Sequence, residues 1–172
     1  MTIDVLGLGE SLSEYRGGNI SFGVNDIFRY VPVNFLVVLD VPGKFTPERL
    51  SIIENSTPEA LYAHKAEWSY HPNYVPIKLQ HGQPDISIDL DSPLIPHTKF
   101  SPFVAVVMAY KYFHADRIEL YGVDMTSHKA LSQDNIAIQI KQHWGVLTGE
   151  LNRRGCEVIV HGKGILTVSG VR

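Results

Sequence analysis

The sequence predicts an α/β fold, a three-layer Rossmann-like sandwich in which helices cover both faces of a mostly parallel sheet. Two observations predict it. Short apolar runs typical of buried strands alternate with helical segments along the chain. The first run, residues 3–7, leads directly into a glycine turn, as in many nucleotide-binding α/β domains. A length of 172 residues suits one domain, so we expect residues 1–172 to form it, with an irregular insertion over residues 55–99.

Three apolar runs predict the first strands of the sheet, at residues 3–7, 20–24 and 35–39. The third run has no polar alternation, which is typical of a central strand covered on both faces. A short helix is expected next, because Thr46 can cap a helix and Pro47 suits the first helical position. Its pattern continues to about Glu54. In the expected insertion, prolines and histidines interrupt the pattern, and strand-like runs remain only at residues 60–63, 75–79 and 86–90.

The second half of the chain predicts two helices and two strands. Ser101 and Pro102 open a helix to about residue 114 that is apolar nearly all round, which indicates a buried helix. Residues 117–121 and 157–161 are expected to be strands. Between them, an apolar stripe at helical spacing predicts a long helix: Ile136, Ile140, Trp144, Leu147 and Leu151. Two glycines four apart on this helix, Gly145 and Gly149, are expected to pack closely against the sheet or a second subunit.

Composition excludes several classes of protein. The 15 Lys and Arg residues against 18 Asp and Glu residues give a formal charge of −3, so we expect no nucleic-acid partner. No apolar run approaches the ~20 residues of a membrane span, and a cytoplasmic location is expected. The single cysteine, Cys156, forms no internal disulfide or thiolate cluster. No tight histidine spacing predicts a metal site.

Polar residues and glycines follow the ends of the predicted strands. Ligands of open parallel sheets bind beyond the carboxyl ends of the strands, so these residues are the candidate site. They are Gly7, Gly9, Glu10, Ser11, Asn25, Asp40 and Asp124. Glycines let the backbone approach a phosphate, and Asn25 and Asp40 can accept hydrogen bonds from a ribose or a base. The alternative is that the glycines serve only the geometry of the turn and that Asp124 caps the turn after it.

The glycine turn matches neither of the two common nucleotide fingerprints. It lacks the third glycine of the dinucleotide motif and the Gly-Lys-Ser/Thr of the P-loop. An ordinary NAD dehydrogenase and a P-loop NTPase are therefore disfavoured.

Several short motifs together resemble a known family. They are GLGESL at 7–12, GVN at 23–25, VVLDVP at 37–42, Ser101 before an apolar helix, and IELYGVD at 118–124. In this order they resemble the bacterial sialyltransferases that use CMP-sialic acid, and through them the 6-hydroxymethylpterin pyrophosphokinase-like family. The resemblance implies a CMP-sugar donor, with Gly7, Gly9, Ser11 and Asn25 around the cytidine phosphate and Ser101 near the sugar.

The polar loop after the strand at 117–121 suggests the catalytic groups, which we expect to be Asp124 and His128. His128, in a polar loop after Asp124, is the candidate base for the proton of the acceptor hydroxyl. Thr126 stands where the sialyltransferases carry a tyrosine that supports the leaving phosphate. Two alternatives stay open: a pyrophosphokinase-like enzyme with Mg²⁺ on Asp40 and Asp124, and a non-catalytic nucleotide-binding or assembly module. Assembly into a homo-oligomer is open as well.

Overall fold

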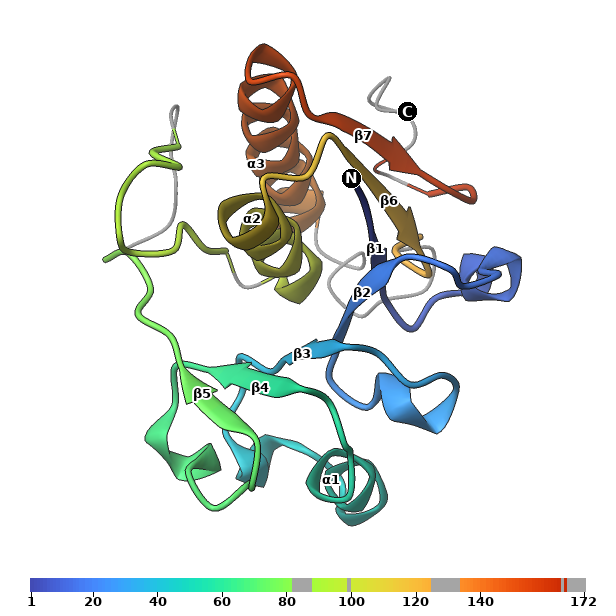
Figure 1. Cartoon of the computed structure of the whole chain (residues 1–172), viewed down its shortest axis with the longest axis vertical. Coiled ribbons are helices and arrows are strands. Elements are labelled where there is room, and N and C mark those ends of the chain that lie inside the picture. The colour runs from blue at the N-terminus through green and yellow to red at the C-terminus, as the bar shows by residue number, and fades with distance from the viewer. Residues whose placement is uncertain (82–87, 99, 125–133, 165, 167–172) are drawn as a thin grey trace.

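A single parallel sheet organises the molecule. The computed structural model describes residues 1–81, 88–98, 100–124, 134–164 and 166. In these residues seven strands form one sheet in the order β5-β4-β3-β2-β1-β6-β7, and every neighbouring pair is parallel (Figure 1). The strands are β1 (Thr2–Leu6), β2 (Ile20–Val24), β3 (Phe35–Val37), β4 (Ala60–Ala63), β5 (Tyr74–Pro76), β6 (Arg117–Tyr121) and β7 (Glu157–Val160). The predicted α/β class is confirmed.

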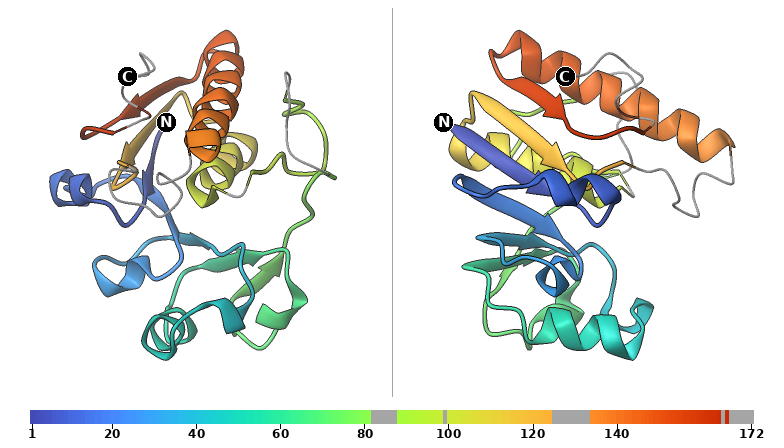
Figure 2. Two further views of the ribbon diagram at one scale, coloured as in Figure 1. Left: turned by 180° about the vertical axis from the view of Figure 1, so that it is seen from behind. Right: turned by 90° about the vertical axis from the view of Figure 1, so that its right-hand side faces the viewer.

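Helices cover both faces of the sheet. The α-helices are α1 (Pro47–Glu54), α2 (Ser101–Phe113) and α3 (Asp134–Arg153), and the 3-10 helices are η1 (Glu10–Glu14), η2 (Ile27–Arg29), η3 (Pro42–Lys44) and η4 (Ala66–Trp68). Figures 1 and 2 show α2 next to α3, with α1 apart from both, beside the β3–β5 end of the sheet. The helix predicted after residue 46 begins as expected, because the Thr46 hydroxyl accepts a hydrogen bond from the Arg49 amide at 3.4 Å.

Two apolar clusters hold the layers together. Alternation along β1 sends Ile3 and Val5 toward α2 and α3, and Leu6 to the opposite face. The central residues of α2, 103–109, are all buried, which confirms the expectation of a buried helix. Trp144 of α3 is 1% exposed and belongs to this core. Full burial of one large apolar side chain contributes about 1.5–3 kcal/mol.

The expected insertion is partly sheet. Within residues 55–99, β4 and β5 extend the sheet at the β3 edge, and Trp68 of η4 is buried in the second apolar cluster. From Ile77 to Phe100 the described residues form no regular element beyond one bridge between Leu79 and Ile95. The prediction of a strand at 86–90 is wrong for residues 88–90, which form no strand. Residues 86 and 87 lie outside the described residues.

The two glycines of α3 do not pack against the sheet, and packing against a second subunit stays a prediction. Gly145 is exposed, and a methyl group there would meet nothing within 4 Å. A methyl group on Gly149 would meet only the Arg153 side chain, at 3.8 Å. The expectation of close packing against the sheet is therefore wrong, since Trp144, Leu147 and Leu151 make that contact.

Within the described part of the chain, no helix combines the length and the apolar character needed to cross a membrane.

The direction of strand addition reverses beside β1. Strands β2 to β5 are added on one side of β1, and the chain then crosses through α2 to β6 on its other side. The carboxyl ends of β1 and β6 therefore flank the position at which ligands of such sheets bind. Because β5 and β6 are both parallel to β1, α2 runs back from the carboxyl edge to the amino edge, so its first residue, Ser101, lies at the carboxyl edge.

Candidate functional site

The turn after β1 and the end of β6 are joined through their backbones. The amide of Gly7 donates to the Tyr121 carbonyl at 2.8 Å, and the amide of Gly9 donates to the Gly122 carbonyl at 2.7 Å. Gly122 has a φ of +71°, and a Cβ built on it would lie 2.2 Å from the Gly7 carbonyl oxygen. Glycine is required at Gly122 for both reasons: its left-handed backbone and the close approach of the other turn.

Ser11 and Asp124 lock the same corner with side chains. The Ser11 amide donates to Asp124 Oδ2 at 2.8 Å, and the Ser11 hydroxyl accepts from the Gly122 amide at 2.8 Å. Gly162, in the turn after β7, closes the corner: a Cβ there would lie 2.1 Å from Asp124 Oδ1. Ser11 and Asp124 are 6% and 3% exposed. Three segments far apart in sequence therefore meet at the β1–β6 position.

One atom of this corner has no partner. Among the described residues, none forms a hydrogen bond with the buried Asp124 Oδ1. A buried polar atom left unpaired costs about 1–3 kcal/mol, and natural proteins pair almost all of them with protein, water or ligand. Asp124 Oδ1 can therefore accept a hydrogen bond from a donor that enters the corner.

These contacts bear on the role of the glycine turn. The amides of Gly7, Gly9 and Ser11 already donate inside the protein. The close approach of two backbones is thus enough to explain the glycines, as in the alternative stated from the sequence. Asp124 caps the start of η1 through the Ser11 amide, and the turn that follows Asp124 lies outside the described residues. Glu10 is exposed beside this corner.

The other predicted site residues share the carboxyl edge but follow different strands. Asn25, just after β2, is half-buried with a φ of 52°, and its amide donates to the Val37 carbonyl at 3.2 Å. Asp40, three residues beyond β3, is exposed, and its carbonyl accepts from Trp68 Nε1 at 2.7 Å. Ser101 is half-buried at the start of α2. All three lie at the carboxyl edge: Asn25 and Asp40 follow the neighbouring strands β2 and β3, and Ser101 begins α2.

Two strands separate the acidic residues considered for magnesium. Strands β2 and β1 lie between β3 and β6, so the strand ends that precede Asp40 and Asp124 are roughly 14 Å apart. A Mg²⁺ ion binds its ligands at about 2 Å. No group of three side chains suited to a metal occurs in the residues that the structure describes.

The predicted catalytic loop cannot be placed. Thr126 and His128 lie within residues 125–133, outside the described residues, so both roles stay predictions.

One histidine at the same edge was not singled out from the sequence. His64 follows β4 directly, is half-buried, and its buried Nδ1 has no hydrogen-bond partner among the described residues. Burial lowers the pKa of His64, the charges of Lys65 and His97 lower it further, and Asp40 and Glu67 oppose them. These effects favour a neutral imidazole, which can donate or accept a hydrogen bond. Its position after a predicted strand was the signal that could have found it.

The fold and the site define a Rossmann-like α/β protein with a closed corner at the strand-order reversal. No protein-family model and no curated protein sequence matches the chain. One solved structure matches its fold: the sialyltransferase CstII from Campylobacter jejuni, in complex with the substrate analogue CMP-3FNeuAc. The two are 10% identical with a TM-score of 0.52, over 92% of this chain and 79% of that chain. At this identity the similarity shows a distant relationship in fold.

Proposed function

We propose that this protein binds a nucleotide-sugar at the carboxyl edge of its sheet and transfers the sugar, as a CMP-sugar-dependent glycosyltransferase of the sialyltransferase type. The observation that carries the proposal is the buried Asp124 Oδ1 at the β1–β6 position, which has no hydrogen-bond partner in the part of the chain that the structure describes. A sugar hydroxyl is the kind of donor that this buried acceptor lacks. The shared fold with a sialyltransferase that was solved with a CMP-sugar analogue supports the choice of ligand.

The order of the strands suggests how the ligand lies. In the proposal the nucleoside contacts Asn25 and Asp40, which follow β2 and β3. The phosphate lies over the turn formed by Gly7, Gly9, Glu10 and Ser11. The sugar then lies beside Asp124 and Ser101, on the β6 side of the phosphate.

Transfer needs few groups. The acceptor hydroxyl attacks the anomeric carbon, the bond from that carbon to the phosphate oxygen breaks, and CMP leaves with the electron pair. We assign the acceptor proton to His128, from its place in the polar loop after Asp124, and support of the leaving phosphate to Thr126, which stands where the sialyltransferases carry a tyrosine. No metal ion takes part in this scheme. The magnesium alternative is less favoured, because the strands that carry Asp40 and Asp124 end far apart.

Thermal unfolding with added nucleotides tests the proposal. CMP, CDP, UDP and ATP are added separately, each with and without Mg²⁺. We expect CMP to stabilise the protein without metal, by about 2.7 kcal/mol when its concentration is a hundred times the dissociation constant. Stabilisation by ATP that requires Mg²⁺ would instead support pyrophosphoryl transfer. No response to any nucleotide would contradict nucleotide binding altogether.

A matched pair of variants locates the bound nucleotide. Asn25 and His114 are the non-glycine residues described with positive φ, at 52° and 49°. Asn25→Gly removes the side chain and keeps the backbone conformation, so it should diminish the shift caused by CMP. His114→Gly makes the same change at the end of α2, on the opposite edge of the sheet, and should leave the shift intact. Equal effects of the two variants would remove Asn25 from the site.

A further inference from the structure

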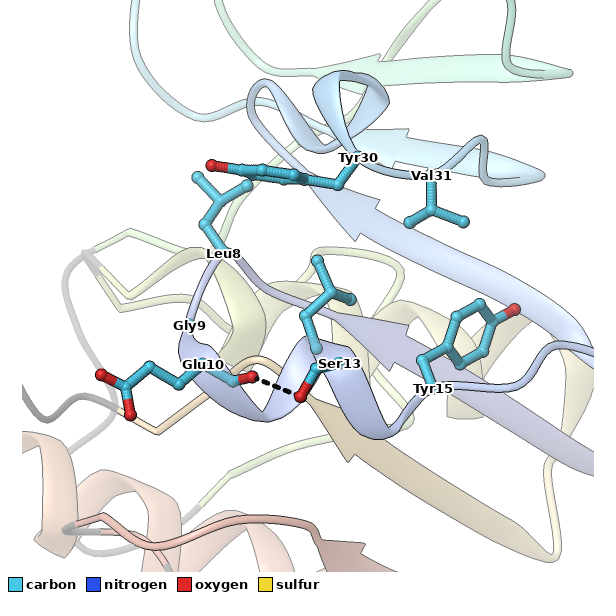
Figure 3. A pocket seen from close by; sticks show the side chains of 8 residues that line it. Leu8, Gly9, Glu10, Ser13, Tyr15, Tyr30 and Val31 are labelled. Atoms are coloured by element: carbon cyan, nitrogen blue, oxygen red, sulfur yellow. Dashed lines mark hydrogen bonds between the residues drawn. The ribbon is translucent and has the colours of Figure 1, made fainter.

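A groove lies between η1 and the chain that follows η2. It has a volume of about 560 Å³. Leu8, Leu12 and Tyr15 line it from the first segment, and Tyr30 and Val31 from the second (Figure 3). Pockets of roughly 300–1,000 Å³ are the usual size for a small-molecule ligand. The groove is therefore large enough for a ring with substituents.

The lining selects for an apolar, uncharged ligand. Tyr30 is 63% exposed and Leu8 is 36% exposed, and Figure 3 shows the Tyr30 ring lying over the Leu8 side chain. Figure 3 shows the Glu10 carboxylate directed away from Leu8 and Tyr30, and none of the residues that line the groove is a lysine or an arginine. The groove therefore offers no cationic side chain to hold a phosphate or an anionic sugar. An aromatic or aliphatic ring would bury the exposed apolar atoms against Tyr30 and Leu12.

The groove adjoins the turn after β1, which also forms one side of the closed corner. Leu8, Gly9 and Glu10 line it, and the next residue, Ser11, binds Asp124. The turn after β1 therefore has the groove on one side and the proposed sugar position on the other.

We propose that this groove binds the apolar, ring-bearing aglycone of the sugar acceptor and so selects aryl glycosides over small alkyl glycosides. The identification of the ligand as a sugar acceptor rests on the proposed function. The binding of an apolar ring depends only on the groove. Tyr30 supplies the stacking surface, and Leu8 and Leu12 supply the apolar walls.

Ligand-detected NMR with two simple glycosides tests the inference without any donor. Phenyl β-glucopyranoside should bind about tenfold more tightly than methyl β-glucopyranoside, because the ring is buried in the groove. Tyr30→Ala should weaken phenyl glucoside binding by about the same factor. Tyr70→Ala is the matched control, since Tyr70 is an exposed tyrosine beside η4, outside the groove, and its loss should change nothing.

The possible outcomes separate this inference from the proposed function. Equal affinity for the two glucosides, or binding that survives Tyr30→Ala, overturns the groove as an aglycone site. Loss of CMP stabilisation in Tyr30→Ala also overturns it, because the nucleotide would then occupy the groove. If the phenyl glucoside binds through Tyr30 and no nucleotide stabilises the protein, the ring site stands and the transferase proposal fails.

Discussion

Two corners of the same sheet edge are built in opposite ways. At β1, β6 and β7, backbone segments approach so closely that Gly7, Gly122 and Gly162 leave no room for side chains. At the carboxyl ends of β3 and β4, which we call the open corner, the side chains of Asp40 and His64 follow the strands. Asp40 is exposed and His64 is half-buried. Each corner keeps one buried polar atom, Asp124 Oδ1 or His64 Nδ1, without a partner in the described residues.

The difference shows why a glycine motif is weak evidence for a phosphate site. In the closed corner the amides of Gly7, Gly9 and Ser11 already donate within the protein, so the glycines serve packing first. The side-chain atom there that has no partner among the described residues is an acidic oxygen, Asp124 Oδ1. In the open corner the groups that a ligand could contact are the side chains of Asp40 and His64, which no glycine motif precedes. Both corners can contact one extended ligand, because they share the carboxyl edge.

The closed corner should fail most severely when its backbone contact is blocked. Gly122→Ala combines a left-handed backbone, which costs about 1–2 kcal/mol, with overpacking, which costs about 1–3 kcal/mol. We expect a loss of roughly 3 kcal/mol in the free energy of unfolding, measured in urea.

Gly17→Ala isolates the backbone contribution to that loss. Gly17 has a φ of +82°, and a methyl group there would meet nothing within 4 Å. It should lose only about 1–2 kcal/mol. Equal losses for Gly17→Ala and Gly122→Ala would mean that the two turns do not press against each other.

A smaller effect is expected from the side chain that joins the turns. Ser11→Ala removes the acceptor of the Gly122 amide and leaves that buried amide unpaired, so the loss should be about 1–3 kcal/mol. Ser13→Ala is the control, because Ser13 is exposed and its hydroxyl donates only to the Glu10 carbonyl. It should change stability by less than about 0.5 kcal/mol. A Ser11 loss no larger than the Ser13 loss would contradict a closed, dry corner.

Much of the fold followed from local pattern. Residues 117–121 alternate between polar and apolar side chains and are followed by Gly122, and the strand has those bounds. Thr46 and Pro47 marked the start of α1 correctly. The β4–β5 extension was less visible, because its strands are short, and prolines and turn residues surround them. The sequence could not show that Gly145 faces away from the sheet, since an exposed helical glycine and a buried one look alike in sequence.

The site was predictable only as a list of strand ends. The pattern placed Ser11 and Asp124 at one edge, but their hydrogen bond joins residues 113 positions apart and depends on which strands are neighbours. Strand order is set by the packing of the whole chain and not by local sequence. His64 was not predicted for the same reason: its buried Nδ1 and its lowered pKa depend on residues that the fold brings close, including His97.

The smallest expected effect is a pH dependence in the open corner. Burial, followed by the charges of Lys65 and His97, lowers the pKa of His64 from its ordinary 6.5. The unfolded chain therefore takes up a proton at a higher pH than the folded protein does. The stability that neutral His64 contributes is complete above about pH 6.5, and it is lost as the pH falls toward the lower pKa of the folded state.

His64→Gln keeps a polar side chain and removes the titration. Urea unfolding of both proteins, from about pH 7.5 down to about pH 5, should show the difference between wild type and variant shifting in favour of the variant as the pH falls. Taking the difference cancels other titrating groups, including Asp4, whose pKa burial raises and whose effect has the opposite sign. A difference that stays constant over this range would mean that His64 is as well solvated in the folded protein as in the unfolded chain. The two corners would then differ only in their packing, and the open corner would hold no buried imidazole nitrogen that needs a hydrogen bond from a ligand.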